Sequence, residues 1–322
     1  MTVDIDSTKQ RAREKLAREV GQEILNLLEQ TTTIELMCNQ DGKLWIDQLG
    51  KPMQVVGCLS SWRVESIIRT VSGYLGKTTT RNSPLLEGEW PLDGSRFAAQ
   101  LPPIVPQGIF SIRKKASAIF TLAQYVTSGV MTQTQSNTLC QAITNHQNIL
   151  LSGGCGSGKT TLANGVIHEM VKTFPNERIF IIEDNGEIQC TAENFVQYLT
   201  SSEANVDMTQ LLKTTLRMRP DRILVGEVRG AEALDLIDAW NTGHPGGVAT
   251  IHANSAIDSL TRMKSLISRN QAAPREIEPL IADAVHLVVF IKKDPAIPAG
   301  RCIDEIIEVI GYENNQYLIR AL

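Results

Sequence analysis

Residues 153–160 have the composition and spacing of a phosphate-binding loop. They read Gly-Gly-Cys-Gly-Ser-Gly-Lys-Thr and match the pattern G-x-x-x-x-G-K-[ST]. In this pattern the glycines let backbone N–H groups surround phosphates, the lysine reaches the β and γ oxygens, and the threonine hydroxyl binds Mg²⁺. The sequence therefore predicts a site for ATP and Mg²⁺, with Thr160 as the metal ligand. The predicted nucleotide-binding residues are Gly153, Gly154, Cys155, Gly156, Ser157, Gly158, Lys159, Thr160 and Thr161.

The flanking residues favour the same interpretation. An apolar segment, Asn148–Leu151, predicts a strand entering the loop, and residues 161–174 predict a helix that Pro175 ends. The positive end of that helix dipole would face the phosphates. Cys155 inside the loop is either a redox-sensitive thiol or a small residue in a small space, and the second reading is favoured.

Two acidic segments end later strand-like runs. Glu183 and Asp184 close one run, with Glu187 just beyond, and Glu227 closes another. Strand carboxyl ends face the ligand crevice of a parallel sheet, where a carboxylate can orient water or hold Mg²⁺. Glu227 is the better candidate for the base, because Gly226 replaces the magnesium-site aspartate expected before it. The alternative for each acid is a helix cap or a surface position.

Basic residues and histidines surround these acids in the sequence. Arg219, in the run 217–222, could stabilise charge on the γ-phosphate in cis or in trans, or form surface ion pairs. His244 and His252 flank a glycine-rich segment but lack a third metal ligand. A histidine that reads the γ-phosphate, or a neighbour's nucleotide, is the better hypothesis for His252.

The elements that must position these residues alternate between strand and helix. Alternation of this kind predicts an α/β domain with a parallel sheet covered by helices. The expected strands are Asn148–Leu151, Ile179–Ile182, Ile223–Val225, Val248–Ile251 and Leu287–Ile291.

Residues 1–118 predict a separate, smaller α+β domain, and residues 119–322 the α/β domain, with a linker near 114–123. An amphipathic helix is expected over about 7–30, where apolar residues recur at helical spacing. It would cover its own domain or dock to a membrane surface or subunit. The remaining expected elements are a hairpin of 34–37 with 44–46, a helix near 64–75, and strands at 96–100 and 108–113.

Composition excludes several classes. The 322 residues are 42% hydrophobic and 20% charged, which suits a globular chain. With 31 basic and 35 acidic residues the net charge is −4, so strong direct binding of nucleic acid is not expected. No run approaches the length of a membrane span, no signal peptide is recognisable, and the six cysteines lack C-x-x-C spacing. A cytosolic protein is expected.

Four segments taken together resemble the secretion traffic ATPases. They are the loop, Glu183 to Glu187, the stretch 216–227, and 242–253, in the order of that family's Walker A, Asp, Walker B and His boxes. Arg96 and residues 110–113 extend the resemblance into the N-terminal domain. The most similar branch is the TrbB-type ATPases of conjugative type IV secretion.

This resemblance implies a RecA-like P-loop domain in a two-tiered homo-hexameric ring, with ATP held between the domains. Arg96 and Arg113 would contact the phosphates, Glu227 would activate water, and Glu183 and Glu187 would assist. The ring would act at the cytoplasmic face of the inner membrane, beside other ATPases and inner-membrane components. It would energise pilus assembly and the transfer of DNA or protein.

Three alternatives remain. A type II secretion or type IV pilus motor shares these boxes, but its C-x-x-C zinc module and long N-terminal region are not seen here. A RecA-like DNA translocase is disfavoured by the net charge. A non-enzymatic scaffold is disfavoured by the intact loop and acids.

Overall fold

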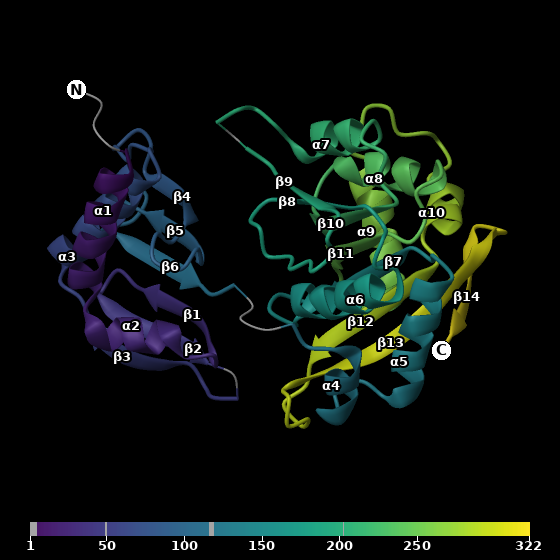
Figure 1. Ribbon diagram of the computed structural model, residues 1–322, viewed down its shortest axis with the longest axis horizontal. Coiled ribbons are helices and arrows are strands. Elements are labelled where there is room, and N and C mark those ends of the chain that lie inside the picture. The colour runs from purple at the N-terminus through teal and green to yellow at the C-terminus, as the bar shows by residue number, and fades with distance from the viewer. Residues whose placement is uncertain (1–4, 49, 116–118, 202) are drawn as a thin grey trace. The chain divides into compact units, whose positions relative to one another are not determined.

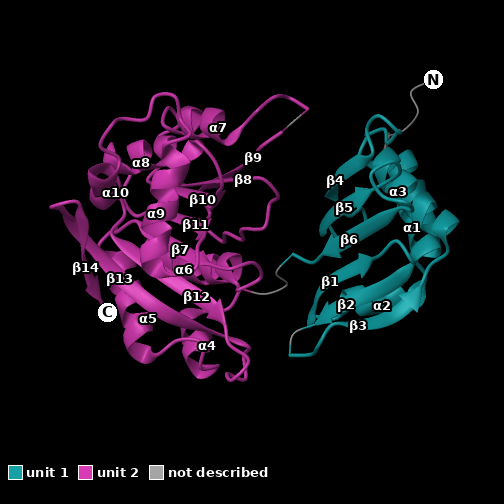
Figure 2. Cartoon of the chain, turned by 180° about the vertical axis from the view of Figure 1, so that it is seen from behind, with its two compact units in different colours: residues 1–117 teal, residues 118–322 magenta. Residues whose placement is uncertain are grey.

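The computed structural model describes residues 5–48, 50–115, 119–201 and 203–322. The chain divides into two compact units, Met1–Ser117 and Ala118–Leu322, which Figure 2 colours separately. Among the described helices, none is long and apolar enough to cross a membrane.

The first unit is a six-stranded antiparallel sheet with helices over one face (Figure 1). The strand order is β3-β2-β1-β6-β5-β4. The helices are α1 (Ile5–Val20), α2 (Gln22–Glu29) and α3 (Ser61–Tyr74). The strands are β1 (Thr33–Cys38), β2 (Lys43–Gln48), β3 (Gln54–Cys58), β4 (Leu85–Glu89), β5 (Arg96–Gln100) and β6 (Ile109–Arg113).

Alternation along the strands decides which side chains meet the helices. Phe97 and Ile112 are fully buried in the core that the helices share, whereas Arg96 and Arg113 point to the other face. The single helix expected over 7–30 is wrong, because Gly21 divides it with a φ of 87°. Only glycine adopts that backbone conformation readily.

The second unit is an eight-stranded sheet ordered β14-β13-β12-β7-β11-β10-β8-β9. The strands from β12 to β9 in this order are parallel, and β13 and β14 are antiparallel. The strands are β7 (Ile149–Gly153), β8 (Ile179–Glu183), β9 (Phe195–Leu199), β10 (Arg222–Val228), β11 (Val248–His252), β12 (Leu287–Lys293), β13 (Arg301–Glu313) and β14 (Gln316–Ala321).

Helices cover both faces of this sheet (Figure 1). Ile149 and Leu151 of β7 belong to one core with α4–α6, and Leu150 belongs to the opposite core with α7–α10. The helices are α4 (Leu122–Thr127), α5 (Gln133–Thr144), α6 (Lys159–Thr173), α7 (Met208–Thr215), α8 (Glu232–Asn241), α9 (Ala256–Ile267) and α10 (Glu278–Ala284).

The α/β class and all five strands expected for this unit are confirmed. Their continuous apolar runs belong to strands buried on both faces. The sequence analysis did not foresee β9, β13 and β14, which lie at or near the sheet edges and carry exposed apolar side chains such as Leu199, Ile310 and Ile319.

Candidate functional site

The phosphate-binding loop connects β7 to α6. Gly158 is the N-cap of α6, with a φ of 104° and no side-chain capping bond, so the first-turn N–H groups are left for a ligand. Gly156 also has a positive φ, 66°. Thr160 and Thr161 lie in the first turn of α6. The loop therefore has the backbone conformation that an anion cradle requires.

Lys159 connects the loop to His252 on β11, the strand beside β7 in the sheet. Its ammonium donates to the carbonyls of Gly153 and Gly154, both at 3.0 Å, and lies 3.2 Å from Nδ1 of His252. The ammonium is also 3.5 Å from Nε2 of the same ring, so it lies close to both ring nitrogens of His252. Nε2 is 2.9 Å from Oε1 of Glu227. Lys159, His252 and Glu227 thus form one connected line.

Glu227 is held on its other side by Arg229. The guanidinium donates to Oε2 at 2.6 Å and also reaches Asp184 at 3.2 Å. Burial by itself raises the pKa of Glu227, but the hydrogen bond and charge of Arg229, with His252 and Lys159, outweigh burial and lower it. Glu227 is therefore ionised at neutral pH.

Glu183 occupies a different environment from Glu227. It is 4% exposed and accepts hydrogen bonds from the backbone N–H groups of Glu187, at 2.7 Å, and Ile188, at 3.1 Å, and from Gln197. Burial raises its pKa, although these hydrogen bonds oppose the shift. Glu187 contributes its backbone N–H, and its half-buried side chain lies close enough to influence the pKa values of Glu183 and Arg229.

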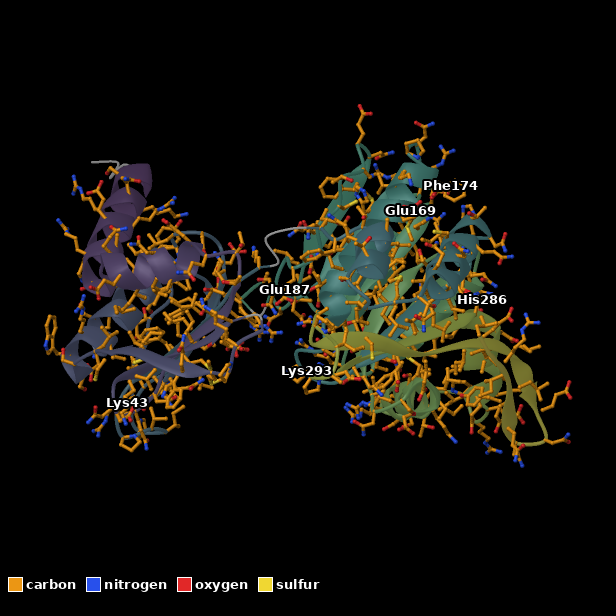
Figure 3. All side chains as sticks on the ribbon, turned by 90° about the horizontal axis from the view of Figure 1, so that it is seen from below. Lys43, Glu169, Phe174, Glu187, His286 and Lys293 are labelled. Carbon is orange, nitrogen blue, oxygen red and sulfur yellow. The ribbon has the colours of Figure 1, made fainter. Side chains whose placement is uncertain are left out.

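Strand order explains why these groups meet. The strands β7, β11, β10 and β8 are neighbours and parallel, so the residues at their carboxyl ends come to one edge. Figure 3 shows Glu187 and Lys293 at this end of the second unit, and Phe174 and His286 at the opposite end. The fold therefore brings the phosphate-binding loop, the predicted acids and His252 to one edge of the sheet.

Arg219 is not brought to this edge within one chain. It precedes β10 with a left-handed φ of 55°, and the carbonyl of neighbouring Met218 accepts a hydrogen bond from Arg178. Glu227 lies five residues beyond Arg222, the first residue of that strand, which is about 16 Å along it. A contact of Arg219 with phosphate in its own chain does not fit this position, so a contact in trans and a surface position are the alternatives that remain.

Arg96 and Arg113 form a cross-strand pair in the first unit. They are directly opposite in the register of β5 and β6, and Glu89 and Glu35 stand opposite them on the outer neighbouring strands. Like charges placed directly opposite destabilise a sheet. In this register an acidic residue stands beside each of the two arginines.

The loop residues fit a nucleotide phosphate with Mg²⁺. The hydroxyl of Ser157 is buried without a hydrogen-bond partner inside the loop, which leaves a polar atom for a ligand. Within the described residues no group of three or more His, Cys, Asp or Glu side chains could hold a metal ion. Mg²⁺ ordinarily binds through few protein groups together with phosphate oxygens and waters, so a hydroxyl such as that of Thr160 fits a site of this kind.

Two supporting residues escaped the sequence analysis. Gln197 binds Glu183, and Thr200 donates to Asp184 at 2.7 Å. Both belong to β9 or directly follow it, and the alternation of Phe195–Leu199 was the available signal.

Fold and site together define a P-loop nucleoside triphosphatase domain of the RecA-like type. The model of the family described as "Type II/IV secretion system protein" matches residues 95–293. The chain belongs to that family, and the resemblance to secretion traffic ATPases is confirmed.

Relatives and solved structures agree with this assignment. The chain is 45% identical to the probable conjugal transfer protein TrbB of Sinorhizobium fredii, over 95% of this chain and 92% of the relative. The fold is similar to the VirB11 ATPase of Brucella suis, with a TM-score of 0.50, 23% identity, and coverage of 94% and 96%. It is also similar to the ATPase DotB of Legionella pneumophila, with a TM-score of 0.63, 18% identity, and coverage of 86% and 77%.

Proposed function

We propose that this protein is an Mg²⁺-dependent ATPase that energises conjugative transfer by a type IV secretion system. The observation that carries the proposal is the line from Lys159 through His252 to Glu227. It joins the phosphate-binding loop to an ionised carboxylate through one imidazole. The 45% identity to a conjugal transfer protein over nearly the whole chain supports the biological setting.

The chemistry would follow from the charges of the site. ATP would bind along the loop, where Thr160 would hold Mg²⁺ and the ion would neutralise charge on the phosphates. Glu227 accepts a proton from water as the oxygen attacks the γ-phosphorus, and the bond to the β-phosphate oxygen breaks to give ADP and phosphate. His252 lies between Lys159 and Glu227, so it is placed to respond when the γ-phosphate leaves. Glu183 and Glu187 would assist Glu227.

The other predicted residues act through assembly in this proposal. Arg96 and Arg113 contact phosphates when the first unit closes on nucleotide, and Arg219 reaches the nucleotide of a neighbouring copy in a homo-hexamer. The ring works at the cytoplasmic face of the inner membrane, with other ATPases and inner-membrane components of the apparatus. The family assignment supports these points.

Hydrolysis measurements test the enzymatic part. Glu227→Gln should keep ATP binding but lower kcat at least about 100-fold, because the base is lost and the shape is kept. Lys159→Ala should lose binding as well. Glu193→Gln, an exposed site on the same unit, is the matched control. A Glu227→Gln variant with the control's kcat would refute the role of the base.

Two further measurements test the assembly and the setting. The rate per subunit should rise with protein concentration if neighbouring copies complete the site. Donor cells that carry Glu227→Gln in place of the wild-type gene should lose conjugative transfer. Normal transfer with an inactive ATPase would refute the conjugative role.

A further inference from the structure

Two cations on the β12–β13 hairpin lie against the phosphate-binding loop. Lys293 ends β12, Arg301 begins β13, and the two are opposite in antiparallel register. The ammonium of Lys293 is 3.1 Å from the position a Cβ would take at Gly156. Nη1 of Arg301 is 2.5 Å from the corresponding position at Gly158. We call Lys293 and Arg301 the cationic rung.

The two cations of the rung form no ion pair with a carboxylate among the residues that the structure describes. The adjacent Lys292, by contrast, pairs with Asp304 at 2.7 Å. Two like charges directly opposite each other repel. An anion on the loop would relieve this repulsion.

The sheet places the rung away from the reacting end of the site. β12 adjoins β7 on one side, and β11, β10 and β8 follow on the other. His252 and Glu227 therefore lie on one side of the loop, and the rung lies on the other. The rung consequently faces the part of the nucleotide that is not transferred.

We propose that Lys293 and Arg301 bind the α- and β-phosphates of the nucleotide, which ATP and ADP share. The inference rests on the proposed function, since it assigns a ligand to the same loop. Interactions made equally with substrate and product set affinity and leave the chemical step unchanged. The rung therefore governs how tightly nucleotide is held.

Binding titrations with ADP and ATP test the rung. Arg301→Gln and Lys293→Ala should each raise both dissociation constants about tenfold or more, because each removes a charge-assisted hydrogen bond. KM should rise in parallel, and kcat should stay within about twofold. Lys292→Ala, on the opposite face of the same strand, is the matched control. Arg301→Lys should restore most of the affinity.

Thermal melting separates binding from a structural role. Without nucleotide, the rung variants should keep or raise Tm, because a repulsion is removed. The increase in Tm that ADP produces should shrink. Rung variants with the same dissociation constant for ADP as Lys292→Ala, or with a lower kcat at unchanged affinity, would overturn this inference and leave the proposed function standing. Wild-type protein that binds neither nucleotide overturns the proposed function as well.

Discussion

Gly226 and Glu183 lie side by side on neighbouring strands, with Cβ of Glu183 2.7 Å from where a Cβ of Gly226 would be. The carbonyl of Gly226 also accepts a hydrogen bond from Thr250 at 2.6 Å, which fixes the strand at this point. Gly226 stands where a magnesium-site aspartate was expected from the sequence. Its missing side chain leaves room for the buried side chain of Glu183 on the neighbouring strand.

Gly226→Ala should therefore push Glu183 out of position. We expect a lower kcat and a loss of about 1–3 kcal/mol in the free energy of unfolding, as overpacking usually costs. Urea unfolding and ATP hydrolysis measure the two effects. Gly311→Ala is the matched control, because nothing lies within 4 Å of its added Cβ. Equal kcat in the two variants would contradict the packing argument.

Arg229→Gln should change the pH dependence of hydrolysis. Arg229 lowers the pKa of Glu227, so its removal raises that pKa. Glu227 accepts a proton only when ionised, and the acidic limb of the kcat/KM profile should shift to higher pH. Arg320→Gln, an exposed site on β14, should leave the profile unchanged. An unshifted profile in Arg229→Gln would argue against Glu227 as the base.

Arg222→Leu should destabilise the second unit from the end opposite the site. Arg222 is fully buried, pairs with Glu177, donates to the carbonyl of Gly246 at 3.0 Å and stacks on Phe174. Removing one member of such a pair costs about 3–5 kcal/mol. Urea unfolding measures the loss.

The control for this prediction is Arg320→Leu, which breaks a more exposed pair with Glu308. Its cost should be below about 1 kcal/mol. Similar losses in both variants would show that burial of Arg222 is not the cause.

His286 should make stability depend on pH. Burial lowers its pKa below the ordinary 6.5, and its Nδ1 accepts the backbone N–H of Asn148 at 3.0 Å. The unfolded chain binds this proton more readily, so the contribution of His286 is complete above pH 6.5 and declines below it. Urea unfolding at several pH values from 5 to 7.5 gives the free energy of unfolding as a function of pH. That free energy should change less with pH in His286→Gln than in the control His244→Gln. Identical slopes would contradict the prediction.

The sequence was informative where one pattern had one explanation. The glycine-rich loop, the five apolar strands and the acids that end them were all found, because spacing and strand direction are local properties. The single helix over 7–30 was wrong because a glycine such as Gly21 can occur inside a helix, and only its positive φ shows that it interrupts this one. Arg219 precedes β10 and Glu227 lies near the end of that strand, so the predicted strand Ile223–Val225 already separated the two residues.

Pairings made across the sheet were equally hidden. The contacts of Gln197 with Glu183 and of Arg301 with the loop join segments that are far apart in the chain. Their positions follow from strand order, which periodicity does not contain. Only the register of the folded sheet brings them together.

The strands of the second unit contribute side chains to two cores at once. Ile149 and Leu150 are successive residues of β7, yet they pack against opposite helical layers. If one helical layer unfolds, the strands that it shares with the other layer lose half of their packing. Heat should therefore unfold both layers in a single cooperative transition. The loop after β7 and the carboxylates at the ends of β8 and β10 should then lose their arrangement in the same transition. No partly unfolded form would keep the loop without the acids.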